Sequence, residues 1–242
     1  MSPRKPLPAG FDPAPAPALA KRRRLPSHER EQMIVKGAIP FFAGAGFSAT
    51  TRDLADHLGI TQSLLYQYFP TKDALIDRLY HELVLDKWKP EWERWLDDRG
   101  TPLADRLERF YLAYTDVIFS YETMRIFFFM RMTGGNRREH HLSQAHNRLF
   151  RKVSVELRLL HGLPAPDDHP VAPEEEEIAA AMHGSIVYYG VRQFIFGVTP
   201  RVARDVFIRR QIAVFLRGAG AEVAALLGID PPRRQPRLVS AG

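Results

Sequence analysis

The segment 61–69 carries amide and hydroxyl side chains at spacings that place them together on one side of a helix. If Leu65 faces the protein interior, Phe69 lies about 40° from it on an ideal helix. Ser63 and Gln67 then point nearly the opposite way, so small polar groups occupy the outer side. Such groups form hydrogen bonds with the edges of bases, and a helix fits the width of the DNA major groove. The segment therefore predicts a helix that reads DNA.

The flanks of this helix add two further kinds of contact. Gln62 and Tyr66 lie on one flank, where an amide and a phenol can bond to bases and phosphates. Leu64 lies on the other flank, where it can meet the methyl group of a thymine. Our central hypothesis is that Leu65 and Phe69 anchor the helix while the polar groups face DNA.

Three short helices are predicted before Pro70, in the arrangement of a helix-turn-helix unit. Ser27 can cap the first helix, which Pro40 should kink or delay. Thr50 opens the second helix with a capping-box-like start. Thr61 can cap the third helix, which ends just before Pro70.

The pattern remains helical after Pro70, without a convincing period-two strand, so the predicted fold class is all-α. The segment 123–132 is apolar nearly all round and should be enclosed by other elements. The further helices are expected over 72–96 with a kink at Pro90, from Thr101 and Pro102 onward, over 123–132, over 142–160, from Pro173 through the apolar run 178–198, and from Thr199 and Pro200 onward.

The last long helix carries two apolar stripes, and each stripe needs a partner. One stripe comprises Val202, Val206, Ala213 and Leu216, and the other comprises Ile208, Ile212 and Phe215. The core of the chain can cover one of them. A second subunit can cover the other through a helix-on-helix interface, most often with two-fold symmetry. We therefore expect a homodimer formed through the last two long helices.

The composition is that of a globular protein, with 242 residues, 45% of them hydrophobic and 26% charged. The sequence has no cysteine, which excludes disulfides and thiolate nucleophiles, and the expected compartment is the cytoplasm. The longest apolar run, 126–130, is far shorter than the roughly 18 residues of a membrane-spanning helix, so no stable membrane insertion is expected. Prolines interrupt residues 1–26, which argues against a secretion signal.

Both ends of the chain are basic and rich in proline, and we expect them to be disordered. Residues 1–26 hold six basic side chains and one acidic one, and residues 231–242 hold three arginines and no acid, which leaves a net charge of −2 for residues 27–230. The basic run 21–24 is a candidate arm that follows phosphates or enters a minor groove. A solvated tail that only aids solubility is an equally good interpretation.

Residues 30–80 resemble the TetR family of bacterial transcriptional regulators. The resemblance rests on residues in the family's order and spacing, namely Phe42, Gly46, Phe47, Thr50, Thr51, Leu54, Ala55, Leu58, Gly59, Ile60, Thr61, Leu65, Tyr66, Tyr68, Phe69 and Lys72. It implies an N-terminal three-helix helix-turn-helix DNA-binding domain followed by a larger helical ligand-binding and dimerisation domain. It implies phosphate contacts at Thr51, Tyr66, Tyr68 and Lys72. It implies base contacts at Arg52, Gln62, Ser63, Leu64 and Gln67, with Thr61 also in the DNA-binding set.

The same resemblance gives a reason to expect a cavity for an unknown small-molecule effector among the aromatic side chains of the larger domain. The candidate ligand-binding residues are Trp92, Phe110, Tyr114, Arg125, Phe128, His183 and Tyr189. For most of them, an ordinary aromatic core is the alternative interpretation.

No pattern in the sequence is typical of an enzyme. It has no nucleophile elbow and no phosphate-binding loop. The spacing of His140, His141 and His146 matches no strong metal motif. We therefore predict no catalytic residue, no cofactor and no metal.

The predicted domains are a basic arm over 1–26, a DNA-binding domain over 27–73, an effector-binding and dimerisation domain over 74–230, and a tail over 231–242. The predicted function is a ligand-responsive transcriptional regulator, expected to be a repressor. It binds an inverted-repeat operator as a homodimer and is released by the effector. The alternative is a helical lipid- or drug-binding protein whose polybasic tail lies on a membrane surface. Sequence-specific retention on duplex DNA distinguishes the two.

Overall fold

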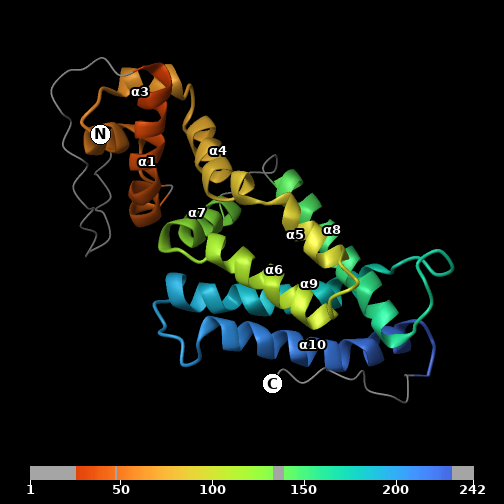
Figure 1. The fold of residues 1–242 in the computed structure, drawn as a ribbon. Coiled ribbons are helices and arrows are strands. Elements are labelled where there is room, and N and C mark those ends of the chain that lie inside the picture. Colours follow the sequence, from red (N-terminus) through yellow and green to blue (C-terminus); the bar gives the residue numbers. More distant parts are fainter. Residues whose placement is uncertain (1–25, 47, 133–138, 231–242) are drawn as a thin grey trace. The chain divides into compact units, whose positions relative to one another are not determined.

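The computed structural model describes residues 26–46, 48–132 and 139–230, and every regular element within these ranges is helical. The predicted all-α fold is therefore confirmed (Figure 1). The elements are α1 (Ser27–Ala45), α2 (Thr51–Leu58), α3 (Gln62–Tyr68), α4 (Lys72–Leu83), the 3-10 turn η1 (Leu85–Lys87), α5 (Pro90–Asp97), α6 (Leu103–Ile118), α7 (Tyr121–Met132), α8 (Glu139–His161), α9 (Pro173–Gly190), the π-helical segment η2 (Val191–Ile195) and α10 (Arg204–Leu226). The predictions for residues 1–25 and 231–242 lie outside the described residues.

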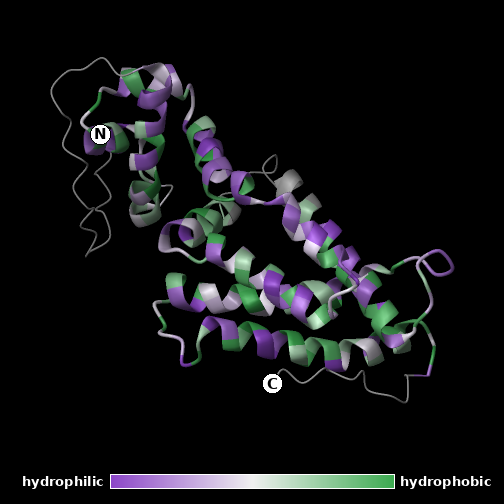
Figure 2. Ribbon diagram, in the orientation of Figure 1, coloured by the Kyte–Doolittle hydropathy of each residue, from purple (hydrophilic) through white to green (hydrophobic). Residues whose placement is uncertain are grey.

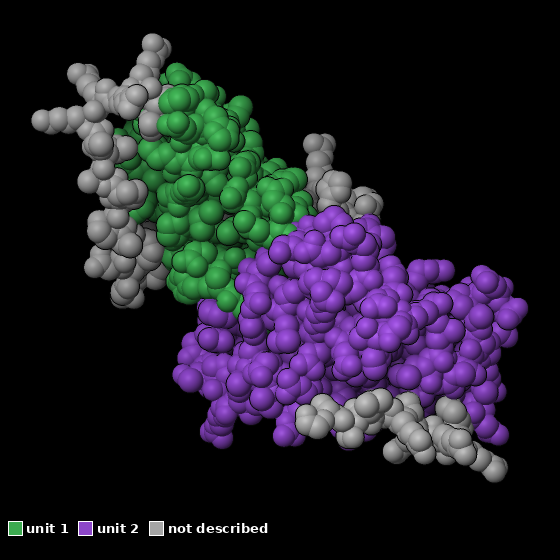
Figure 3. Space-filling model, in the orientation of Figure 1, with its two compact units in different colours: residues 1–87, 118–138 green, residues 88–117, 139–242 purple. Residues whose placement is uncertain are grey.

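The chain forms two compact units, each assembled from separate stretches of the sequence (Figure 3). Unit 1 comprises residues 1–87 and 118–138, and it contains α1 to α4, η1 and α7. Unit 2 comprises residues 88–117 and 139–242, and it contains α5, α6, α8, α9, η2 and α10. Helix α7 thus belongs with the N-terminal helices, although α5 and α6 precede it in the sequence.

Helix α1 buries one apolar side in the core of unit 1. Ile34, Ala38 and Phe42 recur every four residues and are all fully buried, as the helical spacing predicts. The delayed start predicted from Pro40 is wrong, because α1 begins at residue 27 and continues past Pro40 to residue 45, whereas the predicted kink stays a prediction. Pro40 deprives the carbonyl of Lys36 of its helical partner. Both residues are exposed, so water can satisfy that carbonyl.

Threonine hydroxyls cap the three helices that follow α1. Thr50 and Asp53 form the predicted capping box, in which the Asp53 N–H donates to Thr50 Oγ1 (3.1 Å) and the Thr50 N–H donates to Asp53 Oδ2 (2.9 Å). Thr61 and Thr71 accept the same kind of bond at α3 and α4. Each cap contributes about 1 kcal/mol to helix stability. The predicted cap at Ser27 is wrong, since Ser27 is already the first helical residue and the cap position is occupied by a proline.

The single helix predicted over 72–96 is also wrong. Helix α4 ends at Leu83, η1 covers residues 85–87, and α5 begins at Pro90. Proline has no backbone N–H and disfavours helix at the preceding residue, so the chain breaks there instead of bending. Pro90 occupies the first turn of α5, where a missing N–H has no cost.

Helix α7 packs against α1 and α4 within unit 1. The prediction that the segment 123–132 is enclosed is correct only in part, because Ile126 is fully buried whereas residues 127–129 are half-buried. Arg125 donates from Nε to the carbonyl of Ala43. That carbonyl lies in the last turn of α1, where helical acceptors lack partners. Arg125 therefore ties α7 to the end of α1.

Helices α8, α9 and α10 lie side by side and form the main body of unit 2 (Figure 1). The predicted start of the last helix at Thr199 and Pro200 is wrong, since α10 begins at Arg204. Gly197 adopts a φ of 67°, which ends the preceding helical run. The chain before α10 is then held by Tyr189, whose hydroxyl donates to the carbonyl of Val202 (2.9 Å).

Hydrophobic and hydrophilic residues alternate along α10 (Figure 2), as expected for a helix with one buried side. One of its two predicted apolar stripes is wholly buried, namely Ile208, Ile212 and Phe215. The other stripe is divided. Val202 precedes the helix and is 44% exposed, whereas Leu216 is buried.

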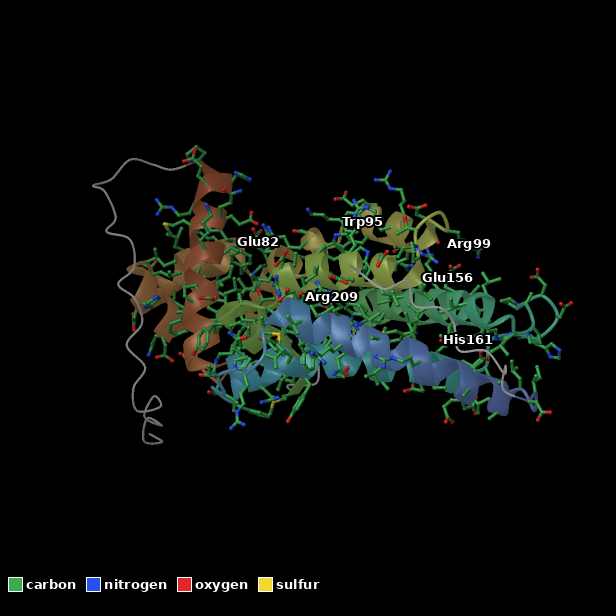
Figure 4. All side chains as sticks on the ribbon, turned by 60° about the horizontal axis from the view of Figure 1, so that its bottom comes forward. Glu82, Trp95, Arg99, Glu156, His161 and Arg209 are labelled. Carbon is green, nitrogen blue, oxygen red and sulfur yellow. The ribbon has the colours of Figure 1, made fainter. Side chains whose placement is uncertain are left out.

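Ion pairs join the helices of unit 2. Arg158 of α8 donates from Nε (2.7 Å) and Nη2 (2.5 Å) to the carboxylate of Glu175 on α9, and both side chains are buried. Arg158 also donates to backbone carbonyls of the loop between α8 and α9. Nearer the surface, Arg99 and Glu156 lie beside each other (Figure 4) and form an ion pair of 2.8 Å.

Candidate nucleic-acid interface

Helix α3 is anchored on one side only. Leu65 and Phe69 are buried, with exposed fractions of 1% and 6%, whereas Ser63 and Gln67 are exposed. Helix α3 packs against α2, and between them Gly59 adopts a φ of 63° that favours glycine. The structure therefore has the one-sided arrangement that the helical spacing predicts.

All but one of the other predicted DNA-binding residues are exposed or half-buried. Arg52 on α2 and Thr61 at the start of α3 are exposed. Tyr66 is 41% exposed. The half-buried members of the set are Gln62, Leu64, Tyr68 and Lys72. The structure thus shows how far each of these side chains is exposed, and their contacts with DNA stay a prediction.

Thr51 differs from the rest of the set because it faces inward. It is 8% exposed. Its Oγ1 lies 3.0 Å from Tyr66 Oη and 3.1 Å from Gln62 Nε2. The hydroxyl therefore joins the first turn of α2 to two side chains of α3. Sequence reasoning missed these bonds, because they depend on how α2 packs against α3.

Lys72, at the start of α4, has an internal partner. Its Nζ donates to the carbonyl of Ala49 (2.7 Å) and lies 5.7 Å from the centre of the Phe42 ring. Burial lowers the pKa of Lys72, while the carboxylates of Asp73 and Asp53 act in the opposite direction. An ammonium carries three donors, so the bond to Ala49 does not exclude a bond to a phosphate. Lys72 fixes the turn before α2 relative to α4.

Unit 2 contains a cluster of aromatic rings contributed by α5, α6, α8 and α9. Four of the seven predicted ligand-binding residues meet there, namely Trp92, Phe110, Tyr114 and His183. The predicted set omitted four other members of the cluster, namely Trp88, Tyr111, His146 and Phe150. Helical spacing is the signal that was available for two of them, since Tyr111 precedes Tyr114 by three residues and Phe150 follows His146 by four.

The polar atoms of this aromatic cluster come from two phenols, two imidazoles and the buried indole N–H groups of Trp88 and Trp92. Tyr111 Oη lies 3.4 Å from His183 Nδ1, and Tyr114 Oη lies 3.4 Å from His146 Nε2, so both hydrogen bonds are long. Burial lowers the pKa of His183 to about 3, and the neighbouring His146 adds to the effect. Burial also raises the pKa of Tyr111. His183 and Tyr111 are therefore both neutral at neutral pH.

The remaining three predicted ligand-binding residues make other contacts. Arg125 and Phe128 belong to α7 in unit 1, where Arg125 binds the end of α1. Tyr189 lies in unit 2, where its ring contacts Phe207 (5.0 Å between centroids) and its hydroxyl binds the loop before α10.

Of the three histidines weighed as metal ligands, only His146 has a side chain that the structure describes. The side chains of His140 and His141 lie outside the described residues. His146 packs against His183 at 4.7 Å between ring centroids. Among the described residues, no group of three histidine or carboxylate side chains is placed to hold a metal ion.

None of the described helices is both long and apolar enough to cross a membrane.

Comparison with known proteins agrees with this geometry. Residues 34–79, which extend from α1 into α4, match the family model described as bacterial regulatory proteins of the tetR family. A solved structure from Mesorhizobium loti MAFF303099, described as a TetR-family transcriptional regulator, is 12% identical and covers 80% of this chain and 98% of its own, with a TM-score of 0.53. A TetR-family transcriptional regulator from Streptomyces coelicolor is 19% identical and covers 84% and 85%, also with a TM-score of 0.53. At these identities the structural likeness concerns the fold alone.

The three N-terminal helices and the one-sided α3 define a helix-turn-helix DNA-binding protein. The family match over residues 34–79 covers the second and third of these helices and most of the first. Residues 34–79 therefore form the N-terminal DNA-binding domain described for the TetR family of transcriptional regulators. Regulators of this family bind DNA and are not enzymes.

Proposed function

We propose that this regulator is a homodimeric repressor that binds an inverted-repeat operator and leaves it when a small molecule binds unit 2. The observation that carries the proposal is the burial of Leu65 and Phe69 beneath the exposed Ser63 and Gln67. A helix held in this way presents its outer side to the major groove without disturbing the core.

Base contacts are proposed for the residues on the outer side and flanks of α3 and for the exposed arginine of α2. These residues are Arg52, Gln62, Ser63, Leu64 and Gln67, with Thr61 at the helix start. Phosphate contacts are proposed for Tyr66, Tyr68 and Lys72. The phenols and the ammonium hold the helix in register, whereas the amides and Leu64 select the sequence.

Long-range attraction to DNA is assigned to the basic arm. Residues 27–78 contain five basic and six acidic side chains, so the folded DNA-binding region carries little net charge. Hydroxyls and the backbone N–H groups of helix starts can bind phosphates at short range but do not attract DNA over a distance. Deleting residues 1–26 should flatten the salt dependence of DNA binding, because fewer counterions are released. An unchanged slope would exclude the arm.

The homodimer is proposed to form through α9 and α10. Gly184 of α9 and Gly218 of α10 are exposed, and a Cβ added at either would meet open space. A glycine inside a helix costs about 1 kcal/mol relative to alanine, and close approach of a further helix gives a reason to retain it. Tyr188 and Val214, one helical turn from these glycines, are 53% and 63% exposed. A second copy of the chain would cover both.

The dimer is tested by changing the proposed interface at one position. Gly218→Glu places a charge among the apolar groups and should convert the dimer to a monomer in sedimentation equilibrium. Asn147→Glu is the matched control, since Asn147 is an exposed residue of α8 outside the proposed interface. A Gly218→Glu variant that sediments as the wild-type dimer would overturn this interface.

The effector is proposed to bind at the aromatic cluster of unit 2. The two hydrogen bonds between phenols and imidazoles are long and therefore weak, so an effector that offers shorter hydrogen bonds can replace them. The switch requires that the effector bind more tightly to the conformation released from DNA than to the bound one. Tyr111→Phe removes one phenol and should weaken release without weakening operator binding in the absence of effector.

The proposal is tested by selecting bound duplexes from a random pool, with and without the low-molecular-mass fraction of a cell extract. The expected product is an inverted repeat whose half-sites lie about 10 base pairs apart or a multiple of that spacing. The extract fraction supplies the effector and should therefore reduce the amount of duplex that the protein retains. Non-specific, salt-labile binding that anionic vesicles compete away would instead favour the lipid- or drug-binding alternative.

A further inference from the structure

The hydroxyl group of Thr51 lies between two side chains of α3. Its Oγ1 is 3.1 Å from Gln62 Nε2 and 3.0 Å from Tyr66 Oη. Thr51 belongs to the first turn of α2 and is 8% exposed, so it lies behind the proposed DNA-reading surface. Gln62 is half-buried and Tyr66 is 41% exposed, so both extend from this hydroxyl toward the surface.

The direction of the two hydrogen bonds follows from the atoms available. A hydroxyl has one hydrogen and can accept two, whereas the amide nitrogen of Gln62 only donates. Thr51 therefore accepts from Gln62 and can donate its own hydrogen to Tyr66. This direction leaves the phenolic hydrogen of Tyr66 for a phosphate oxygen. The opposite direction would leave the hydrogen of a buried hydroxyl in need of another acceptor, which is unfavourable.

The bond to Thr51 also sets the orientation of the Gln62 amide. A primary amide has two N–H donors and one carbonyl acceptor. Thr51 engages one donor, which leaves the carbonyl oxygen and the second N–H. This donor and acceptor pair is the one that bonds to N7 and the N6 amino group of adenine in the major groove. Without the hydroxyl, the amide would turn freely and hold this arrangement for only part of the time.

We propose that Thr51 is a positioning residue that makes Gln62 select adenine, although Thr51 itself does not contact DNA. The proposal rests on the proposed contact between Gln62 and a base. It assigns different roles to the two partners of Thr51. Gln62 sets the preference for one base pair, and Tyr66 strengthens binding to every sequence through a phosphate.

The test uses the full chain and the duplex selected from the random pool. The base pair read by Gln62 is identified as the one whose preference disappears in Gln62→Ala. Dissociation constants are then measured for that duplex and for its three substitutions at this pair. Wild type should prefer the A·T pair by about 5- to 150-fold, the range of one bidentate contact.

Thr51→Val removes the hydroxyl and preserves the shape of the side chain, so the preference should fall to that of Gln62→Ala. Thr51→Ser retains the hydroxyl and should retain the preference. Tyr66→Phe should weaken binding to all four duplexes by the same factor. Thr51→Ala is measured beside Thr51→Val, with thermal unfolding of each, so that the result does not depend on one variant folding.

A purely structural role for Thr51 predicts a different outcome. Thr51→Val would then weaken all four duplexes equally and leave the preference intact, which would overturn the proposal. In the background of Gln62→Ala, Thr51→Val should produce no further loss of preference, and a further loss would also overturn it. If wild type enriches no sequence, the proposed function fails. If wild type enriches an operator and Thr51→Val keeps its preference, the inference about Thr51 alone fails.

Discussion

The two units use their polar side chains in opposite ways. In unit 1, Thr51, Gln62 and Tyr66 form a small hydrogen-bonded group that reaches from the interior to the surface. In unit 2, Arg158 and Glu175 satisfy each other deep inside, with side chains that are 1% and 0% exposed. A surface that binds another molecule benefits from polar groups held in place with donors left over. A buried pair instead ties helices together, and its removal is costly.

The largest effect is expected from breaking this buried pair. Arg158→Met leaves the carboxylate of Glu175 buried without its guanidinium and should lower the free energy of unfolding by about 3 to 5 kcal/mol. Denaturant-induced unfolding measures the change. The double variant Arg158→Met with Glu175→Met should recover part of the loss, because no uncompensated charge remains. A loss of less than about 1 kcal/mol in the single variant would remove the contrast between the two units.

The next effect concerns the pH dependence of stability. The pKa of His183 is lowered by burial from 6.5 to about 3, so the unfolded chain binds more protons between these values. The stability that depends on neutral His183 is therefore complete above pH 6.5 and is lost as the pH falls toward 3. At about pH 4.5 the loss should reach about 3 kcal/mol. His183→Asn does not titrate, and its unfolding free energy should vary less over this range; an unchanged pH slope would contradict the buried neutral imidazole.

A smaller effect is expected in unit 1, where α1 and α2 approach closely. A Cβ added to Gly37 would overlap with Leu58 Cδ2, and Leu58 is buried at 6% exposure. Gly37→Ala should therefore destabilise the protein by about 1 to 3 kcal/mol and weaken DNA binding by shifting α2. Lys36→Ala, at the exposed neighbouring position, should change stability by less than about 0.5 kcal/mol. Equal stability of the two variants would show that the close approach of α1 and α2 is not required.

The predictable parts of the molecule are those governed by neighbours in the sequence. The one-sided α3 follows from helical spacing, and the caps at Thr50, Thr61 and Thr71 act within three residues. The bonds of Thr51 were not predictable, because they depend on the packing of α2 against α3.

The same reasoning explains what was missed in unit 2. The predicted helix start at Pro173 is confirmed, but the bond from Glu175 to Arg158 could not be predicted because it crosses from α9 to α8. Pro90 was predicted to kink one long helix, whereas it begins a new one. A proline can do either, and the spacing of apolar residues does not distinguish the two. The aromatic cluster draws on four helices, so the sequence identified its members only in part.

The central claim is that the outer side of α3 reads bases while Lys72 holds the DNA backbone. It is tested most directly by selecting duplexes from a random pool with wild type, Gln62→Ala and Lys72→Ala. Gln62→Ala should change the preferred sequence at one position of each half-site, at a cost of about 1 to 3 kcal/mol in discrimination. Lys72→Ala should weaken binding to all sequences by a similar factor and leave the preferred sequence unchanged. Coincident sequence profiles for wild type and Gln62→Ala would contradict the account.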